Sequence, residues 1–252
     1  MAIDQRLAAV ILAAGQCQRT GGRPKMLWQV GGRTLIERVI AAAGAAGASR
    51  IVCVLGHQRD QVAAILPAGV ESVVQRERLG TGHAAMQAEP LLAGFPGEVL
   101  VLCGDKPLLG AGTLRRLVGL VRAERAAAAV LTFQAPAGSA YGRIIRDRRG
   151  RVLKIVEARD ASAGELAGCE ANGGAYCFRA GELFGRLHRL TTRNAQGEYD
   201  LTDVVGLLIA DGRRVAALRI ADPDEALGVN SAQELAAVRA AVRRGAGVAG
   251  RV

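Results

Sequence analysis

LAAVILAA, residues 7–14, is an unbroken apolar run that stops abruptly at Gly15. A run without polar interruption is typical of a strand buried on both faces of a parallel sheet, between two layers of helices. This run therefore predicts an α/β protein whose first strand lies in the interior of the sheet.

The loop that follows, GQCQRTGGRPK (15–25), holds three glycines, two arginines and a lysine, and little that could pack in a core. Glycines let backbone N–H groups turn toward an anion, and Arg19, Arg23 and Lys25 add positive charge. The Walker A pattern GxxxxGK[ST] is absent. The loop predicts a cradle for a nucleotide triphosphate, with an ordinary glycine-rich surface turn as the alternative.

Strand-like and helix-like segments alternate through the first half of the chain. The expected strands are 7–14, 50–56, 70–75, 98–105 and 127–135. The expected helices are 34–47, 60–66, 81–94 and 112–126. This alternation predicts a doubly wound, mainly parallel sheet with helices on both faces.

After residue 136 the alternation changes. Residues 141–158 read as a hairpin that turns at Arg149 and Gly150, and they are followed by further elements at 171–180 (strand), 201–212 (helix), 214–220 (strand) and 231–245 (helix). We expect one domain over 1–240, with a nucleotide-binding part at about 1–135, a smaller β-rich part at about 136–228, and a frayed end at 241–252.

The composition narrows the class of ligand. The chain has 252 residues and a formal net charge of +10, but its arginines are scattered and only 3% of its residues are aromatic. This favours a polyanionic small molecule over nucleic acid, which stays the weakest alternative. No run approaches the ~18 apolar residues of a membrane span, no signal peptide is seen at the start, and the five cysteines form no CxxC pair. We expect a cytoplasmic protein without a membrane or nucleic-acid partner; a homo-oligomer is left open.

Lysine is rare in this sequence. Of the 33 basic residues only Lys25, Lys106 and Lys154 are lysines. Lysine presents a compact point charge, whereas arginine presents a broad planar fork. One interpretation of the lysines in RPK (23–25) and GDK (104–106) is that these two positions need a compact charge. Chance placement is the other.

Ligands of open parallel sheets bind beyond the carboxyl ends of the strands. Asp105 closes the strand expected at 98–105, and a carboxylate there suits Mg²⁺, which prefers oxygen ligands. Asn230 offers a second oxygen. Each has a plainer interpretation, Asp105 as the cap of a turn and Asn230 as the cap of the helix that follows.

Gln75 ends the third expected strand and precedes Gly80 and Thr81 at a helix start. Its amide could read a base edge while Gly80 lets the ring approach the backbone. The alternative is a simple helix cap at Thr81. The three histidines form no metal-ligand pattern and no nucleophile signature is present, so covalent catalysis is not expected.

Seven segments together resemble a known family. They are QRERLGTGHAAMQA (75–88), LCGDKPLL (102–109), AYGRIIRD (140–147), IVEARDA (155–161), EANGGAY (170–176), NAQGEYDLTDVV (194–205) and GVNSAQELA (228–236). In this order they resemble the uridylyltransferase domain of bacterial N-acetylglucosamine-1-phosphate uridylyltransferases, of the sugar-nucleotidyltransferase superfamily. The resemblance implies a Rossmann-like fold with a sugar-binding lobe, and the formation of UDP-N-acetylglucosamine and pyrophosphate from UTP and N-acetylglucosamine 1-phosphate.

The resemblance also implies roles for individual residues. The nucleotide would be held by Leu12, Ala13, Ala14, Gly15, Gln75, Gly80, Thr81 and Gly104. Arg19 and Lys25 would be catalytic and hold the phosphates, and Asp105 and Asn230 would ligate Mg²⁺. The sugar would be bound by Gly142, Glu157 and Asn172. A plainer interpretation of Glu157 is a surface carboxylate paired with Arg159.

The sequence departs from the family at several positions. Cys17, Gln18 and Thr20 replace the usual loop residues, Asp200 stands where the family has a second tyrosine, and Lys106 stands where it has an apolar residue. No hexapeptide repeat follows residue 240, so no β-helical acetyltransferase domain is expected.

The first loop is closer to molybdenum-cofactor nucleotidyltransferases, whose loop reads LAAGxSxRMGxPKxLL. Residues 12–28, LAAGQCQRTGGRPKMLW, resemble that pattern, and the spacing from Arg19 to Lys25 is close to the spacing from its arginine to its lysine. Cytidylyl or guanylyl transfer to a pterin is therefore one alternative function. A nucleotide-sugar binder without activity is another, because the altered loop could obstruct the amides meant for the triphosphate.

Overall fold

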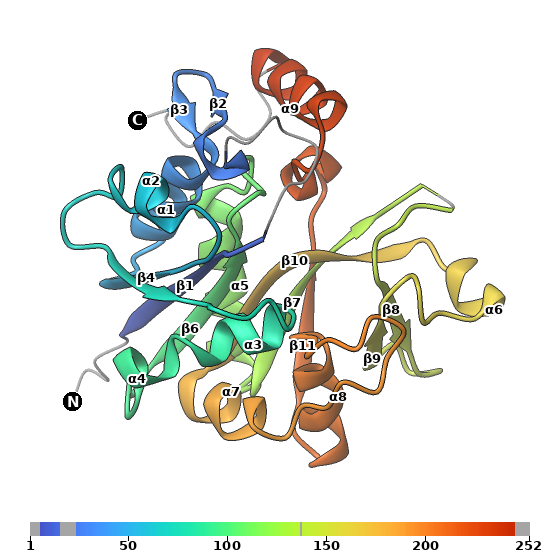
Figure 1. Ribbon diagram of the computed structural model, residues 1–252. Helices are drawn as coiled ribbons and strands as arrows, with labels where there is room; N and C mark the ends of the chain where they lie inside the picture. Colours follow the sequence, from blue (N-terminus) through green and yellow to red (C-terminus); the bar gives the residue numbers. More distant parts are fainter. Residues whose placement is uncertain (1–5, 16–23, 137, 245–252) are drawn as a thin grey trace.

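The computed structural model describes residues 6–15, 24–136 and 138–244 (Figure 1). In its main sheet the strands lie side by side in the order β11 (Val215–Arg219), β7 (Ala128–Gln134), β10 (Glu170–Arg179), β6 (Glu98–Cys103), β1 (Leu7–Ala13), β4 (Arg50–Leu55) and β5 (Glu71–Val74). β1 pairs in parallel with β4 on one side and with β6 on the other. The predicted interior position of the first strand is confirmed.

Helices cover both faces of this sheet. Successive side chains of a strand point to opposite faces, and β1 uses both. Ala9 and Ile11 pack in one core with α1 (Leu35–Ala45) and α5 (Ala111–Ala123). Ala8 and Val10 pack in a second core with α3 (Thr81–Met86), α4 (Glu89–Leu92), α7 (Ala180–Leu187) and α8 (Asp203–Ala210). All four β1 side chains are fully buried, which explains why the run admits no polar residue.

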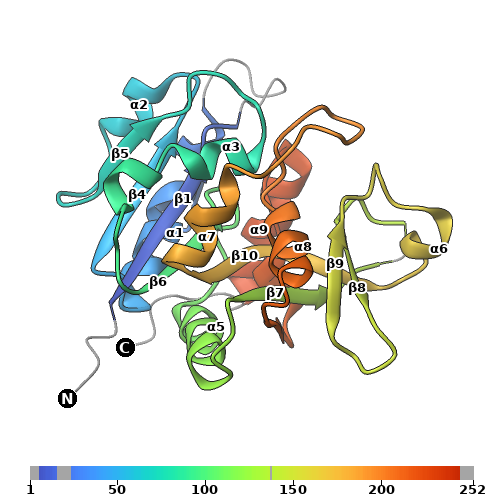
Figure 2. The ribbon, with the colours of Figure 1, turned by 90° about the horizontal axis from the view of Figure 1, so that it is seen from below.

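One strand makes the sheet mixed. β10 runs antiparallel between β6 and β7, and its first residues also pair with β8 (Arg143–Arg146). β8 forms a hairpin with β9 (Val152–Val156), and this hairpin and α6 (Ala163–Leu166) make a small lobe beside the helical layers (Figure 2). The predicted fold, a Rossmann-like, doubly wound, mainly parallel sheet with a small β-rich lobe, is confirmed.

Some short elements differ from the expectation. The single helix expected at 81–94 is two helices, α3 and α4, with Pro90 in the first turn of α4, where a missing N–H is tolerated. The elements that were not predicted are the 3₁₀ helix η1 (Lys25–Leu27), the hairpin of β2 (Gln29–Val30) and β3 (Arg33–Thr34), α6, α7, and the 3₁₀ helix η2 (Pro223–Ala226). α2 (Arg59–Ala63) lies within the helix expected at 60–66, apart from its first residue.

The last helix returns to the beginning of the chain. Val238 and Ala241 of α9 (Ala232–Arg244) pack with Val30 and Leu35 in a third apolar cluster. Figure 1 shows α9 beside the β2–β3 hairpin. This packing carries Asn230, which lies just before α9, to the short helix η1 that contains Lys25.

Candidate active site

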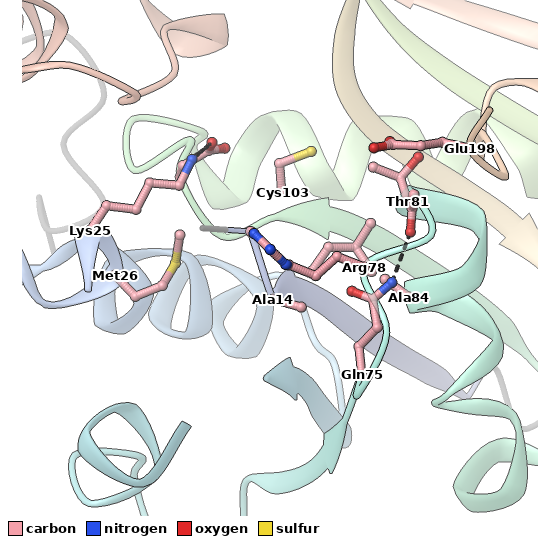
Figure 3. Close-up of a pocket in the computed structure, with 13 residues that line it drawn as sticks. Ala14, Lys25, Met26, Gln75, Arg78, Thr81, Ala84, Cys103 and Glu198 are labelled. Atoms are coloured by element: carbon pink, nitrogen blue, oxygen red, sulfur yellow. Dashed lines mark hydrogen bonds and ion pairs between the residues drawn. The ribbon is translucent and has the colours of Figure 1, made fainter. Parts of the chain in front are cut away.

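A cavity of about 350 Å³ lies where β1 and β6 end, beside the start of α3 (Figure 3). It is lined by Leu12, Ala14, Gly15, Lys25, Met26, Gln75, Arg78, Gly80, Thr81, Ala84, Cys103, Asp105 and Glu198. Figure 3 shows Gln75 and Thr81 at one end of the cavity and Lys25 at the other. Most residues predicted for the nucleotide therefore meet here.

Two other residues predicted for the nucleotide, Ala13 and Gly104, are not among those that line the cavity. Ala13 is buried in the core that contains α1 and α5. Gly104 donates its N–H to the carbonyl of Leu12, and a Cβ at Gly104 would lie 2.9 Å from the sulfur of Met26. Gly104 thus lets the ends of β1 and β6 and the helix η1 approach one another closely.

Gln75 is fixed at the end of the cavity that lies opposite Lys25. The buried side chain donates from Nε2 to the carbonyl of Gly80 at 3.0 Å and lies 3.1 Å from Nδ1 of His83. Gly80 has φ 102° and ψ 177°, a conformation open only to glycine. The two residues form one unit, in which the glycine backbone sets the orientation of the amide.

Thr81 does not cap α3, because Gly80 is the residue before the helix and Thr81 Oγ1 instead accepts from the N–H of Leu201 at 3.0 Å. The carbonyl of Tyr199 accepts from the N–H of Gly82 at 2.7 Å. The loop that contains Tyr199 and Leu201 therefore supports the Gln75 end of the cavity from outside.

Gly80→Ala is expected to lower the free energy of unfolding by about 1–3 kcal/mol. A Cβ at Gly80 would lie 2.5 Å from the carbonyl oxygen of Tyr199, in a backbone conformation that alanine avoids. Gly112→Ala in α5 is the matched control, because a Cβ there meets nothing within 4 Å. Urea unfolding of both variants measures the difference, and equal stability of the two would contradict this account of Gly80.

The opposite end of the cavity holds a polar cluster formed by Lys25, Asp105 and Asn230. The Lys25 ammonium donates to Asp105 Oδ2 at 2.5 Å and to Asn230 Oδ1 at 2.6 Å. Lys25 is 8% exposed, so the three groups interact in a largely dry environment where electrostatic interactions are strong. Asp105 comes from the turn after β6 and Asn230 from the start of α9, so three distant parts of the chain meet at one point.

The plainer interpretations of these residues are wrong. Ser231 caps α9: its Oγ accepts from the N–H of Glu234 at 3.2 Å, while Asn230 turns its side chain to Lys25. The Asp105 carboxylate pairs with the Lys25 ammonium, and among the described residues no backbone N–H donates to it, so Asp105 does not cap the turn after β6.

The oxygen atoms around Lys25 fit a hard divalent cation. A carboxylate oxygen and an amide oxygen already converge on one positive charge, and both are ligand types that such cations prefer. Within 6–15, 24–136 and 138–244 no cluster of three or more His, Cys, Asp or Glu forms a complete protein site. A cation bound here would complete its coordination with phosphate oxygens and water.

The residues predicted for the sugar lie together where the lobe joins β10. The N–H of Asn172 donates to the carbonyl of Gly142 at 2.9 Å, and a Cβ at Gly142 would lie 3.2 Å from Glu157 Oε2. Glu157 Oε1 accepts from the hydroxyl of Thr202 at 3.1 Å, whereas Arg159 donates to Gln196, so the expected alternative pairing with Arg159 is wrong. Burial raises the pKa of Glu157.

The Asn172 side chain is held on both sides. Its Nδ2 donates to Tyr176 Oη at 2.6 Å, and its Oδ1 accepts from the N–H of Gly174 at 3.0 Å. Gly142, Glu157 and Asn172 are not among the residues that line the 350 Å³ cavity.

Asp200 stands beside Glu157. Burial, then the charges of Glu157 and Asp203, raise the pKa of Asp200 to about 7. The carboxylate accepts from Asn194 Nδ2 at 3.1 Å, and no ion pair with a basic side chain is found for it within the described part of the chain. The folded protein therefore takes up a proton at Asp200 that the unfolded chain releases.

The expected consequence is a loss of stability as pH rises from about 4 to about 7, because the unfolded Asp ionises first. Asp200→Asn lacks this titration. We therefore expect the free energy of unfolding of Asp200→Asn, relative to that of the parent protein, to be about 1–2 kcal/mol higher at pH 8 than at pH 5. Urea unfolding at both pH values measures this, with the 95% exposed Asp60→Asn as control. A difference independent of pH would contradict the assignment.

Some cavity residues were not predicted, and some predicted residues cannot be placed. Arg78, Cys103 and Glu198 line the cavity. Cys103 could have been found from its place near the end of the strand expected at 98–105, and Arg78 from its place in the loop after the strand expected at 70–75. Met26 has no such signal, because the three-residue helix η1 has no periodicity. Arg19 and the neighbouring departures Cys17, Gln18 and Thr20 lie outside the described residues.

Comparison with protein families gives one match over most of the chain. The profile of the MobA-like NTP transferase domain matches residues 9–203. The chain belongs to this family. The matched range contains most of β1, all of β6, and both Lys25 and Asp105, and it ends directly after Thr202.

Other family members confirm the resemblance drawn from the sequence motifs. The bifunctional protein GlmU of Pelotomaculum thermopropionicum is 47% identical over 239 residues, which are 94% of this chain and 52% of that protein. GlmU of Pelobacter propionicus is 44% identical over 243 residues, covering 95% of this chain and 53% of its own. The chain spans about half the length of these relatives.

The fold of this NTP transferase also occurs in solved structures. A UDP-glucose pyrophosphorylase complexed with UDP-glucose has a TM-score of 0.77 at 17% identity, covering 96% of this chain and 99% of that one. A UDP-glucose pyrophosphorylase from Acinetobacter baumanii has a TM-score of 0.71 at 22% identity, covering 93% and 92%. At these identities the likeness shows the fold alone.

Proposed function

We propose that the chain is a Mg²⁺-dependent uridylyltransferase that forms UDP-N-acetylglucosamine and pyrophosphate from UTP and N-acetylglucosamine 1-phosphate. The observation that carries this proposal is the convergence of Lys25, Asp105 and Asn230 at one end of a cavity whose other end holds Gln75. The GlmU relatives, at up to 47% identity, support the choice of base and acceptor. They also make pterin nucleotidyl transfer the less favoured alternative.

The phosphate end of the site supplies charge rather than a reactive group. Asp105 and Asn230 would hold Mg²⁺, and the bound ion would neutralise phosphate charge and polarise a phosphoryl oxygen. Lys25 would stabilise the negative charge that develops on the leaving pyrophosphate. We include Arg19 in this role on the resemblance alone.

The reaction itself needs little from the protein beyond geometry. A phosphate oxygen of the sugar phosphate attacks the α-phosphorus of UTP in line, and the bond to the bridging oxygen breaks, so that pyrophosphate leaves with the electron pair. The attacking oxygen is already ionised at neutral pH, so no protein base is required. Holding both substrates in line is then the main contribution of the site.

The two substrates would lie at opposite sides of Asp105. Gln75, Gly80 and Thr81 would hold the uracil, with the strand end at 12–15 beside the nucleoside. Glu157 would accept hydrogen bonds from sugar hydroxyls, because Thr202 already orients its carboxylate. Asn172 and the backbone of Gly142 would complete the sugar site.

The proposal extends to the organisation of the chain. Residues 1–240 would act as one nucleotidyltransferase domain, with the nucleotide bound by about 1–135 and the sugar by about 136–228. The described helices include none with the length and apolarity of a membrane span. A cytoplasmic location and the option of self-association stay predictions.

Pyrophosphate release tests the proposal directly. The purified chain is incubated with Mg²⁺, one of UTP, CTP or GTP, and one of N-acetylglucosamine 1-phosphate, glucose 1-phosphate or a reduced pterin cofactor. We expect release with UTP and the amino-sugar phosphate above all other pairs. Release only with CTP or GTP and the pterin would overturn the proposal, and stabilisation by UDP-N-acetylglucosamine without any turnover would indicate an inactive binder.

A further inference from the structure

Lys106 is a buried cation that the proposed function does not use. It follows Asp105 in the turn after β6 and is 9% exposed. No carboxylate forms an ion pair with it within 6–15, 24–136 and 138–244, although many other basic side chains in this part of the chain form such pairs. A buried charge without a counter-charge is costly, so its contacts need an explanation.

The ammonium of Lys106 holds the segment that leads to Asn230. Its Nζ donates to the carbonyl of Ala226, at the end of η2, at 2.7 Å in the buried interior. The Lys106 Cγ lies 4.0 Å from the position of a Cβ on Gly228. Next to it the N–H of Val229 donates to the Asp105 carbonyl at 3.0 Å. These contacts fix the backbone that carries Asn230 relative to Asp105.

The same side chain also contacts the sugar side of the site. The Lys106 Nζ lies 5.3 Å from the centre of the Tyr141 ring, within the range of a cation–π interaction. Its Cε would lie 2.5 Å from a Cβ on Gly174, so the side chain passes where only a glycine leaves room. Tyr141 precedes Gly142, and Gly174 donates its N–H to Asn172.

The geometry explains why this position is a lysine in a chain whose basic residues are mostly arginine. The space beside Gly174 admits a narrow aliphatic stem, and the planar guanidinium of arginine is broader than the ammonium. An apolar side chain of similar length would fill the space but would leave the buried carbonyl of Ala226 without this donor.

We propose that Lys106 is a positioning residue that holds the Asn230 segment and the Gly142–Asn172 segments in one fixed arrangement around Asp105. This inference rests on the proposed function for the meaning of that arrangement. A single ammonium then sets the distance between the divalent-cation ligands and the sugar ligands, without touching either substrate.

Lys106→Met tests the proposal in the full chain, with Lys154→Met as the matched control, because Lys154 is half exposed and lies on β9. We expect Lys106→Met to raise both the half-saturating Mg²⁺ concentration and the KM for the sugar phosphate by about 10-fold, with a smaller change in kcat. A fall in kcat alone, with both concentrations unchanged, would overturn the positioning role.

Amide hydrogen exchange without ligands gives a readout that is independent of activity. In Lys106→Met the amides of Val229, Asn172 and Gly174 should all exchange about tenfold faster, the effect of leaving one buried acceptor unpaired. Faster exchange at Val229 alone, or at none, would overturn the proposal. An inactive parent protein would overturn the proposed function but leave this measurement valid.

Tyr141→Leu covers the case in which Lys106→Met does not fold. It removes the ring under the ammonium but keeps the bond from Lys106 to Ala226. We expect faster exchange at Asn172 and Gly174 and a higher KM for the sugar phosphate, with Val229 and the half-saturating Mg²⁺ concentration unchanged. No change on the sugar side, or equal changes on both sides, would contradict the proposal.

Discussion

Asp105→Ala is expected to lower kcat/KM for pyrophosphate release by about 10²–10³-fold. The substitution removes one of the two oxygens that face the Lys25 ammonium, and with it the carboxylate proposed to hold Mg²⁺. It also leaves that ammonium largely buried without its counter-charge. The half-saturating Mg²⁺ concentration should therefore rise, and the free energy of unfolding should fall.

Asp60→Ala is the control for Asp105→Ala, because its side chain is 95% exposed in α2. Circular dichroism and urea unfolding establish that both variants are folded under the assay conditions. If folded Asp105→Ala keeps a turnover within a few-fold of the parent protein, the assignment of Asp105 is wrong.

Lys25→Met is the second prediction with a large effect. We expect kcat to fall by about 10²–10³-fold, because the ammonium proposed to stabilise the leaving pyrophosphate is lost while the length of the side chain is kept. Lys154→Met removes a positive charge at the surface and should leave kcat unchanged. Initial rates over a range of UTP concentrations separate the effect on kcat from the effect on KM.

The outcome for Lys25 distinguishes two roles. If only the KM for UTP rises and kcat is kept, Lys25 binds the nucleotide equally in ground and transition states and is not catalytic. Lys25→Arg should not restore activity, because the site between Asp105 and Asn230 holds a compact ammonium at 2.5 and 2.6 Å from their oxygens.

The fold could be predicted where burial dictates composition. LAAVILAA reads as an interior strand because both faces of β1 are covered, and no other residue class is tolerated there. The elements that were missed are short or depend on tertiary packing. The helix η1 has three residues and no periodicity, and the division of 81–94 into two helices depends on one proline.

The same distinction applies to the residues of the site: some could be placed from local sequence, and others are brought together only by tertiary packing. Asp105 and Gln75 could be placed from local sequence, because both follow strands whose carboxyl ends share one edge of the sheet. The pairing of Lys25 with Asn230 joins residues that are 205 positions apart, and only the packing of α9 against the β2–β3 hairpin brings them together. The surroundings of Lys106 depend on a bulge in β10 between Asn172 and Tyr176, and no sequence pattern predicts this bulge.

The central place of β10 limits how this protein can be re-engineered. Tyr176 and Phe178 pair with both β6 and β7 in the middle of the sheet, while Ala171 on the same strand pairs with the lobe. A chimera that exchanges residues 136–228 for those of a relative would replace an interior strand of the host as well as the residues proposed to bind the sugar. New acceptor preferences are therefore better sought by point substitution than by grafting a module.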